Sequence, residues 1–184
     1  MRLGEQLVSE GLLSAETLRQ IGASADSSTD ADLAETLIEQ QTLAAEDVLG
    51  VWGRLCGVPW VETVDETWLD PSLVDDLALE WVRREEVLPV RVDGVLTALT
   101  ADPRAASPLD DLRLMLGREP DPLLVPRSEL RRAIERCYFS REEDRGAVHE
   151  ALADAHASEA GVETSNDLLR SSRDTPVTQL VNMI

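Results

Sequence analysis

The sequence predicts an α+β protein in two parts: an all-helical repeat of two helical hairpins at residues 1–57, and a small α/β domain with a mixed sheet at residues 58–139. Three observations lead to this prediction. The apolar pattern of the first 57 residues recurs along the chain, and after Gly57 it changes to short β-like runs between helices. Only 3% of the 184 residues are aromatic, so the core is built of aliphatic side chains, which favours helices over a β-sandwich.

The repeat emerges when the chain is aligned with itself at an offset of 30 residues. In each copy the apolar positions predict a helix, a turn and a second helix. The matching pairs are Leu3 and Leu33, Leu7 and Leu37, Val8 and Ile38, Leu13 and Leu43, Leu18 and Val48, and Ile21 and Val51. A hairpin with one apolar face cannot bury that face alone, so we expect the two copies to pack on each other.

The two copies differ at their helix ends. In the first copy Gly11 is suited to end a helix, and Ser14 is suited to cap the next one. In the second copy Gln41 and Ala44 stand at these positions, so we expect weaker helix termini there.

The α/β part begins with a short strand near Trp60. Asp70-Pro71 then predicts a helix that runs through Leu77 to Trp81. Two strands follow at residues 87–92 and 95–100, joined by Asp93-Gly94, the strongest short signal for a β-hairpin.

The remaining elements complete a β-α-β-β-α-β-α order. Ser107-Pro108 opens a helix that Gly117 closes, residues 123–125 form a short strand, and residues 128–138 form a last helix. This order indicates a compact α/β domain with a small mixed sheet.

Two further segments are predicted after the α/β part. Residues 140–173 are rich in Ala, Glu, Asp and Ser, which is typical of a flexible acidic linker. Residues 174–184 carry Val177, Leu180, Val181 and Ile184 at helical spacing, and we expect this helix to continue into a further domain.

Composition limits the classes of function. The formal net charge is −19, and all 17 basic residues are Arg. This charge disfavours nucleic acids and anionic lipids as direct partners, and without Lys the chain holds neither a Schiff base nor a GxxxxGK[ST] phosphate loop. No signal peptide, membrane-spanning run or disulfide framework is apparent, so we expect a cytoplasmic protein.

No residue constellation supports catalysis or a metal site. His149 and His156, the only histidines, are interpreted as solvated linker residues. The carboxylate pairs Asp75-Asp76, Glu85-Glu86 and Asp110-Asp111 are interpreted as solvated helix faces rather than acid/base dyads. We therefore expect that this region is not an enzyme by itself.

Two groups of side chains leave alternatives open. The four tryptophans, Trp52, Trp60, Trp68 and Trp81, either pack the junction between the two parts or form a docking surface that includes Trp68. The arginines of the last helix either pair with Glu129 and Glu135 or hold a partner's carboxylate or phosphate. The docking candidates among them are Arg127, Arg131, Arg132 and Arg136.

An opening motif is formed by Arg2-Leu3-Gly4, Leu7, Gly11 and Leu18. This motif resembles the repeat that opens the N-terminal region of the ATPases that drive bacterial type II secretion and type IV pilus assembly. The resemblance continues through Gly57–Val61, Val87–Val90, Thr97–Leu99, Ala101–Pro103, Asp110–Arg113, Asp174–Val177 and Leu180–Ile184.

The resemblance implies a non-catalytic region that docks a motor onto the cytoplasmic domain of an inner-membrane platform protein. The full-length protein would then be a hexameric ATPase using ATP and Mg²⁺, peripheral to the membrane through its partners, and residues 174–184 would begin its motor domain. No cofactor is implied for the region itself.

Some members of the family bind cyclic di-GMP with two copies of the opening motif. The resemblance therefore implies an alternative sensor function, with Arg2, Leu3, Gly4, Leu7, Gly11 and Leu18 as its motif residues. The second copy departs from the motif at Asp32, Ala34 and Gln41, and an acidic side chain repels phosphate. A further alternative is a stand-alone adaptor without a motor.

Overall fold

The computed structural model describes residues 2–24 and 29–139. The chain divides into two compact units, Met1–Arg141 and Glu142–Ile184, and every described residue belongs to the first unit. The predictions for residues 140–173 and 174–184, and those for His149 and His156, lie outside the described residues.

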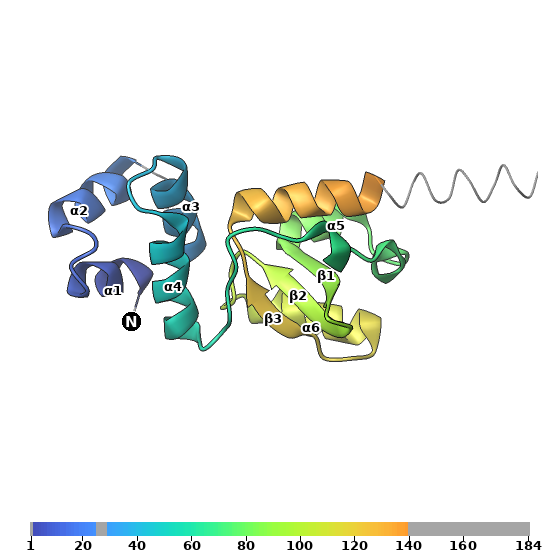
Figure 1. Ribbon diagram of the computed structural model, residues 1–184. Helices are drawn as coiled ribbons and strands as arrows, with labels where there is room; N and C mark the ends of the chain where they lie inside the picture. The colour runs from blue at the N-terminus through green and yellow to red at the C-terminus, as the bar shows by residue number, and fades with distance from the viewer. Residues whose placement is uncertain (1, 25–28, 140–184) are drawn as a thin grey trace, which may run out of the picture. The chain divides into compact units, whose positions relative to one another are not determined.

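The first part consists of the two predicted helical hairpins (Figure 1). Helices α1 (Leu3–Ser9) and α2 (Ala15–Ser24) form the first hairpin, and α3 (Asp30–Glu39) and α4 (Ala45–Cys56) form the second. The turns repeat as well: the N–H groups of Leu12 and Leu13 donate to the Leu7 carbonyl, as those of Thr42 and Leu43 do to the Leu37 carbonyl. The 30-residue repeat of the sequence is thus also a repeat of backbone hydrogen bonds.

The helix ends differ between the copies as their residues predict. Gly11 has a φ of +75°, and Gln41 takes up the same left-handed region with a φ of 53°. The Ser14 hydroxyl accepts a hydrogen bond from the Thr17 N–H at 3.0 Å, whereas Ala44 has no side chain that can cap α4. The first copy therefore has the better stop and the better cap.

The four helices enclose one hydrophobic core. Leu3, Leu7, Leu37, Leu49 and Trp52 are at most 1% exposed within it. Close approach at the first turn depends on Gly4, because a Cβ there would lie 2.8 Å from Leu18 Cδ1 and 3.1 Å from Leu33 Cδ2. The hairpins thus pack on each other, as the pattern predicts.

The α/β part begins with two short 3₁₀ helices, η1 (Glu66–Trp68) and η2 (Pro71–Val74), followed by α5 (Leu79–Glu85). The prediction of one continuous helix from Asp70 to Trp81 is wrong. Tight turns end at Val74 and Leu77, and the extended backbone of Ala78 separates them from α5. The apolar residues of this stretch, including Val74, Leu77 and Val82, are still buried, so the segment satisfies the core without helical regularity.

The sheet contains β1 (Val87–Val92), β2 (Val95–Thr100) and β3 (Asp121–Leu124) in the order β1-β2-β3. β1 pairs antiparallel with β2, and β2 pairs parallel with β3, so the predicted mixed sheet is confirmed. Both turn residues of the hairpin have positive φ, 50° at Asp93 and 82° at Gly94, which a two-residue turn of this kind requires.

One predicted strand is missing. Trp60 forms an isolated parallel bridge to Leu124 instead of a strand. Val61 N–H donates to the Leu124 carbonyl and Leu124 N–H donates to the Pro59 carbonyl, so the segment adds only one bridge to the edge of the sheet. The neighbouring Val58 carbonyl and the Trp60 ring are packed on Gly53, which holds this stretch against α4.

Two helices cover the sheet. α6 (Ala106–Leu116) and a final helix at residues 127–139 lie on opposite sides of it (Figure 1), and β1 is buried along Val87–Val90. α6 begins one residue before the predicted Ser107 and ends at Gly117, whose φ of +64° fits the predicted stop. In the described part of the chain no helix has both the length and the apolar character that a bilayer crossing needs.

Candidate functional site

Three of the six residues of the opening motif meet in one pocket. Arg2 and Gly4 of the first turn of α1 and Leu18 of α2 line a pocket of about 280 Å³. Its other lining residues are Glu5, Gly22, Thr29, Asp30 and Leu33. The pocket therefore lies between the starts of α1 and α3, and it is built from both copies of the repeat.

The other three motif residues have structural roles in this chain. Leu3 and Leu7 are fully buried in the helical core. Gly11 lies in the α1–α2 turn, where its positive φ favours a residue without a side chain.

Carboxylates occupy the polar edge of this pocket. Glu5 accepts a hydrogen bond from the Arg2 N–H at 3.0 Å, and Asp30 Oδ1 accepts one from the Leu3 N–H at 3.2 Å. The other oxygen of Asp30 pairs with Arg104 Nη1 at 2.5 Å. The first backbone donors of α1 thus face acidic side chains of the protein itself. Sequence reasoning missed Asp30 and Arg104, which are 74 positions apart.

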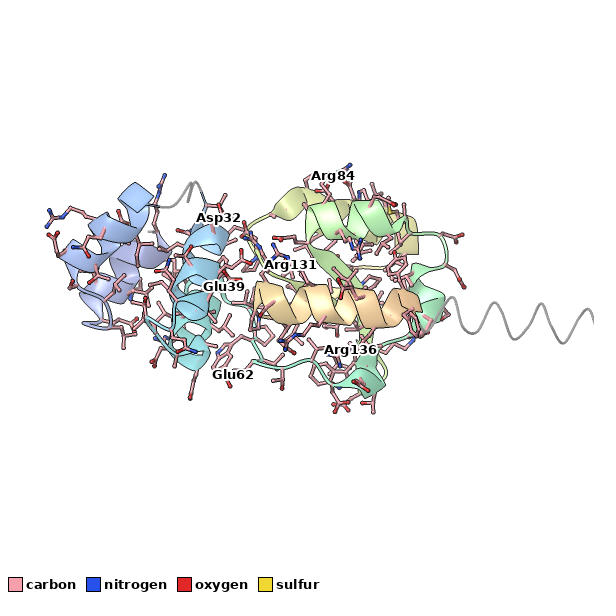
Figure 2. The ribbon with its side chains drawn as sticks, turned by 90° about the horizontal axis from the view of Figure 1, so that it is seen from above. Asp32, Glu39, Glu62, Arg84, Arg131 and Arg136 are labelled. Carbon is pink, nitrogen blue, oxygen red and sulfur yellow. The ribbon has the colours of Figure 1, made fainter. Side chains whose placement is uncertain are left out.

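A second charged cluster joins α3 to the α/β part. The guanidinium of Arg127, 14% exposed, pairs with the carboxylates of Asp32, Glu35 and Glu86. Its distance to Asp32 Oδ1 is 3.2 Å and to the Glu86 carboxylate 2.7 Å. Arg131 adds a contact to Glu35 at 3.0 Å. Asp32 on α3 and Arg131 on the final helix are labelled in Figure 2.

The pKa values of Arg127 and Asp32 are shifted in favour of their charged forms. Burial alone would lower the pKa of Arg127, but Glu35 and Glu86 outweigh it and raise this pKa above its ordinary value. Burial alone would raise the pKa of Asp32, but hydrogen bonds from Thr29 and Arg127 outweigh it and lower this pKa. Asp32, which replaces the Arg of the motif, is thus engaged in a contact within the chain.

The predicted docking arginines separate into two groups. Arg127 and Arg131 contact α3 and Glu86, as described above. Arg132 pairs with Glu129 at 2.7 Å, as predicted, whereas Arg136 pairs with Glu66 at 2.6 Å and not with Glu135. Glu135 instead lies 3.7 Å from Arg83.

Arg136 borders a groove on the α/β part. The groove has a volume of about 680 Å³ and is lined by Glu66, Leu69, Pro71, Glu135, Arg136 and Phe139. Its wall at residues 66–71 includes η1, which carries Trp68. The side chain of Trp68 is partly buried against the core of the α/β part.

The tryptophans do not form one cluster. Trp52 and Trp60 belong to the helical core, whereas Trp68 and Trp81 pack against the core of the α/β part. The prediction that all four pack the junction is therefore wrong for Trp68 and Trp81. The backbone of Trp60 joins the α/β part through its bridge to Leu124, whereas its ring packs on Gly53 of α4. Within residues 2–24 and 29–139, no three His, Cys, Asp or Glu side chains are grouped so as to hold a metal ion.

Comparison with known proteins relates the α/β part to a domain family. Residues 57–144 match the model of the MshEN domain family. The chain is also 24% identical over 185 residues to the type IV pilus assembly ATPase PilB of Myxococcus xanthus. That match covers 100% of this chain and 32% of PilB, so the chain spans about a third of the length of this curated relative.

A solved structure supports the fold. A structure of MshE with cdg matches at a TM-score of 0.54 and 24% identity, over 75% of this chain and 99% of the other. The N-terminal domain of XpsE matches at a TM-score of 0.41 and 23% identity, over 72% of this chain and 91% of that domain. The predicted resemblance of this chain to the N-terminal region of secretion and pilus ATPases is confirmed by the family match, the PilB match and the MshE structure.

Proposed function

We propose that this chain is a non-catalytic interaction and regulatory region of a type II secretion or type IV pilus assembly ATPase. It docks the motor onto the cytoplasmic domain of an inner-membrane platform protein. The observation that carries the proposal is the PilB match, which extends over the whole chain but over only 32% of PilB. The whole protein is then a hexamer that uses ATP and Mg²⁺ and reaches the membrane through its partners.

The charge of the chain supports docking to protein rather than to lipid or nucleic acid. A net charge of −19 repels phosphate-rich surfaces and attracts basic ones. The helical repeat and the α/β part each have a hydrophobic core, so they present stable surfaces to a partner.

Calorimetric titration of the 184-residue chain with the cytoplasmic domain of an inner-membrane platform protein from the same organism tests the proposal. We expect saturable binding with 1:1 stoichiometry that weakens as salt is raised. The absence of heat at protein concentrations in the high micromolar range would contradict docking. Nucleotide hydrolysis by the purified chain would contradict its non-catalytic character.

A second candidate function is favoured by the pocket of the first motif. Arg2, Gly4 and Leu18 meet there, and MshE has been solved with cdg, cyclic di-GMP. An Arg can stack on guanine or pair with phosphate, and a glycine allows close approach of the ligand. Against this, Glu5 and Asp30 place negative charge at the same pocket, and its volume is small for a dinucleotide.

Calorimetry with cyclic di-GMP separates the two candidates. Heat that disappears in Arg2→Met but not in Arg132→Met would support the sensor, and no heat at high micromolar ligand would remove it. The stand-alone adaptor is tested by the gene beyond Ile184, because a downstream GxxxxGK[ST] loop excludes it.

A further inference from the structure

The groove beside Arg136 has an apolar floor with one exposed aromatic side chain. Leu69 and Pro71 contribute from the segment around η1 and η2, and Phe139 contributes from the final helix. Phe139 is the only phenylalanine of the chain, and 64% of it is exposed. An exposed aromatic ring beside half-buried apolar residues is the composition expected at the centre of a protein interface.

The borders of this groove are acidic. Residues 61–80, the segment that supplies Glu66, Leu69 and Pro71 to the groove, contain seven carboxylates and no basic residue. On the groove itself Glu66 is 73% exposed and Glu135 is 66% exposed. Arg136, which reaches Glu66 across the groove, and Arg83, which lies near Glu135, offset only part of this charge.

We propose that this groove binds a basic amphipathic segment of a partner protein. Apolar side chains of that segment contact Leu69, Pro71 and Phe139, and its Arg or Lys side chains face Glu66 and Glu135. The inference rests on the proposed docking function and names its surface. Charge complementarity selects this occupant over a second copy of the chain, because two copies of net charge −19 repel each other.

A designed peptide tests the groove directly. The probe is a fluorescein-labelled 18-residue Leu/Lys peptide with Leu at i, i+3, i+4 and i+7, compared with a scrambled peptide of equal composition. Fluorescence anisotropy with the whole 184-residue chain measures both affinities. We expect the amphipathic peptide to bind about tenfold more tightly than the scrambled one, because only it can present apolar and basic faces together.

Matched variants locate the binding surface. Phe139→Ser removes the exposed ring, and we expect it to weaken binding about fivefold. The control Leu114→Ser removes a side chain that is 79% exposed on α6, and we expect no change. The peptide affinity of Glu135→Lys is compared with that of Glu46→Lys, a substitution at an exposed site on α4. Both substitutions change the net charge by the same amount, so a difference in affinity reports on the groove.

The outcomes are decisive for the groove. Equal affinity of the two peptides, or equal loss in Phe139→Ser and Leu114→Ser, would overturn the proposal, as would a failure of the amphipathic peptide to bind. Thermal melts of each variant establish that it is folded. If the platform domain binds the unmodified chain and Phe139→Ser equally well, the groove is excluded while the docking function stands. If the platform domain does not bind the unmodified chain, the docking function fails.

Discussion

The two helical hairpins have the same turns and the same apolar positions, yet the residues at their helix ends make different contacts. In the first, the residues at the start and end of the helices serve local structure and line a pocket. In the second, α3 begins one turn earlier relative to the repeat, and Asp30, Asp32 and Glu35 contact arginines of the α/β part. The first copy thus lines a pocket with part of its motif, while the second copy is held by ion pairs to the neighbouring part of the protein.

This contrast suggests how a duplicated unit diverges. The buried leucines are retained because both copies need the same core, whereas the polar ends are free to change. Asp32 in place of a basic residue removes an attraction for phosphate, and at the same time supplies a partner for Arg127. The variants below test how far the two copies differ.

The largest effect is expected for the contact that only the second copy makes. Arg127→Met leaves Asp32, Glu35 and Glu86 beside each other with Arg131 as their remaining cation. We expect the free energy of unfolding to fall by about 2–3 kcal/mol, because partly buried carboxylates lose their counter-charge. Urea denaturation measures the change. Arg2→Met, at the corresponding end of the first copy, is the control, and an equal loss there would refute the contrast.

A smaller effect is expected at the two left-handed turn residues. Gly11→Ala should cost about 1 kcal/mol, and Gln41→Gly should stabilise the protein by a similar amount, because only glycine adopts positive φ without strain. Opposite shifts of the melting temperature are the expected result. Shifts of the same sign would show that side-chain contacts, not backbone strain, determine these positions.

At the capping positions we again expect a loss of stability from a substitution in the first copy and a gain from one in the second. Ser14→Ala removes the hydrogen bond to the Thr17 N–H and should cost about 1 kcal/mol. Ala44→Ser introduces a capping hydroxyl at the start of α4 and should gain about 0.5 kcal/mol. Chemical denaturation resolves both changes, and a neutral Ala44→Ser would indicate that the backbone of the second copy does not direct the hydroxyl to α4.

The smallest effect is a pH dependence carried by Asp32. Its pKa is lower in the folded protein than in the unfolded chain, so its contribution to stability is present above the ordinary carboxyl pKa of about 4 and is lost as the pH falls through the folded value. We expect Asp32→Asn to be less stable than the unmodified protein at pH 7, with the difference disappearing near pH 2. A difference that persists at pH 2 would assign the effect to the shape of the side chain.

The sequence predicted those features that depend on neighbouring residues. The 30-residue repeat located both hairpins, and Asp93-Gly94 located the turn between β1 and β2. Arg2, Gly4 and Leu18 are grouped in the sequence only by the family resemblance, and the structure brings these three together in one pocket.

The remaining features depend on residues far apart in the chain. Arg127 meets Asp32 across 95 positions and Glu35 across 92, and no local pattern indicates such pairs. The helix predicted from Asp70 fails because the core accepts Val74 and Leu77 from tight turns as readily as from a helix. Periodicity predicts which of these side chains are buried, but not the backbone that buries them.

Leu124 belongs to two structures at once. It ends β3 in the sheet, and its side chain is fully buried among the residues of the helical core. A chain divided after Gly57 would therefore expose this leucine to water in the α/β half, and would open a gap beneath α4 in the other half. Burial of a leucine contributes about 1.5–3 kcal/mol, so each half alone would lose stability that neither can replace. The repeat and the α/β part should consequently unfold in a single transition, and a domain boundary drawn through the sequence at this point does not separate two independent folding units.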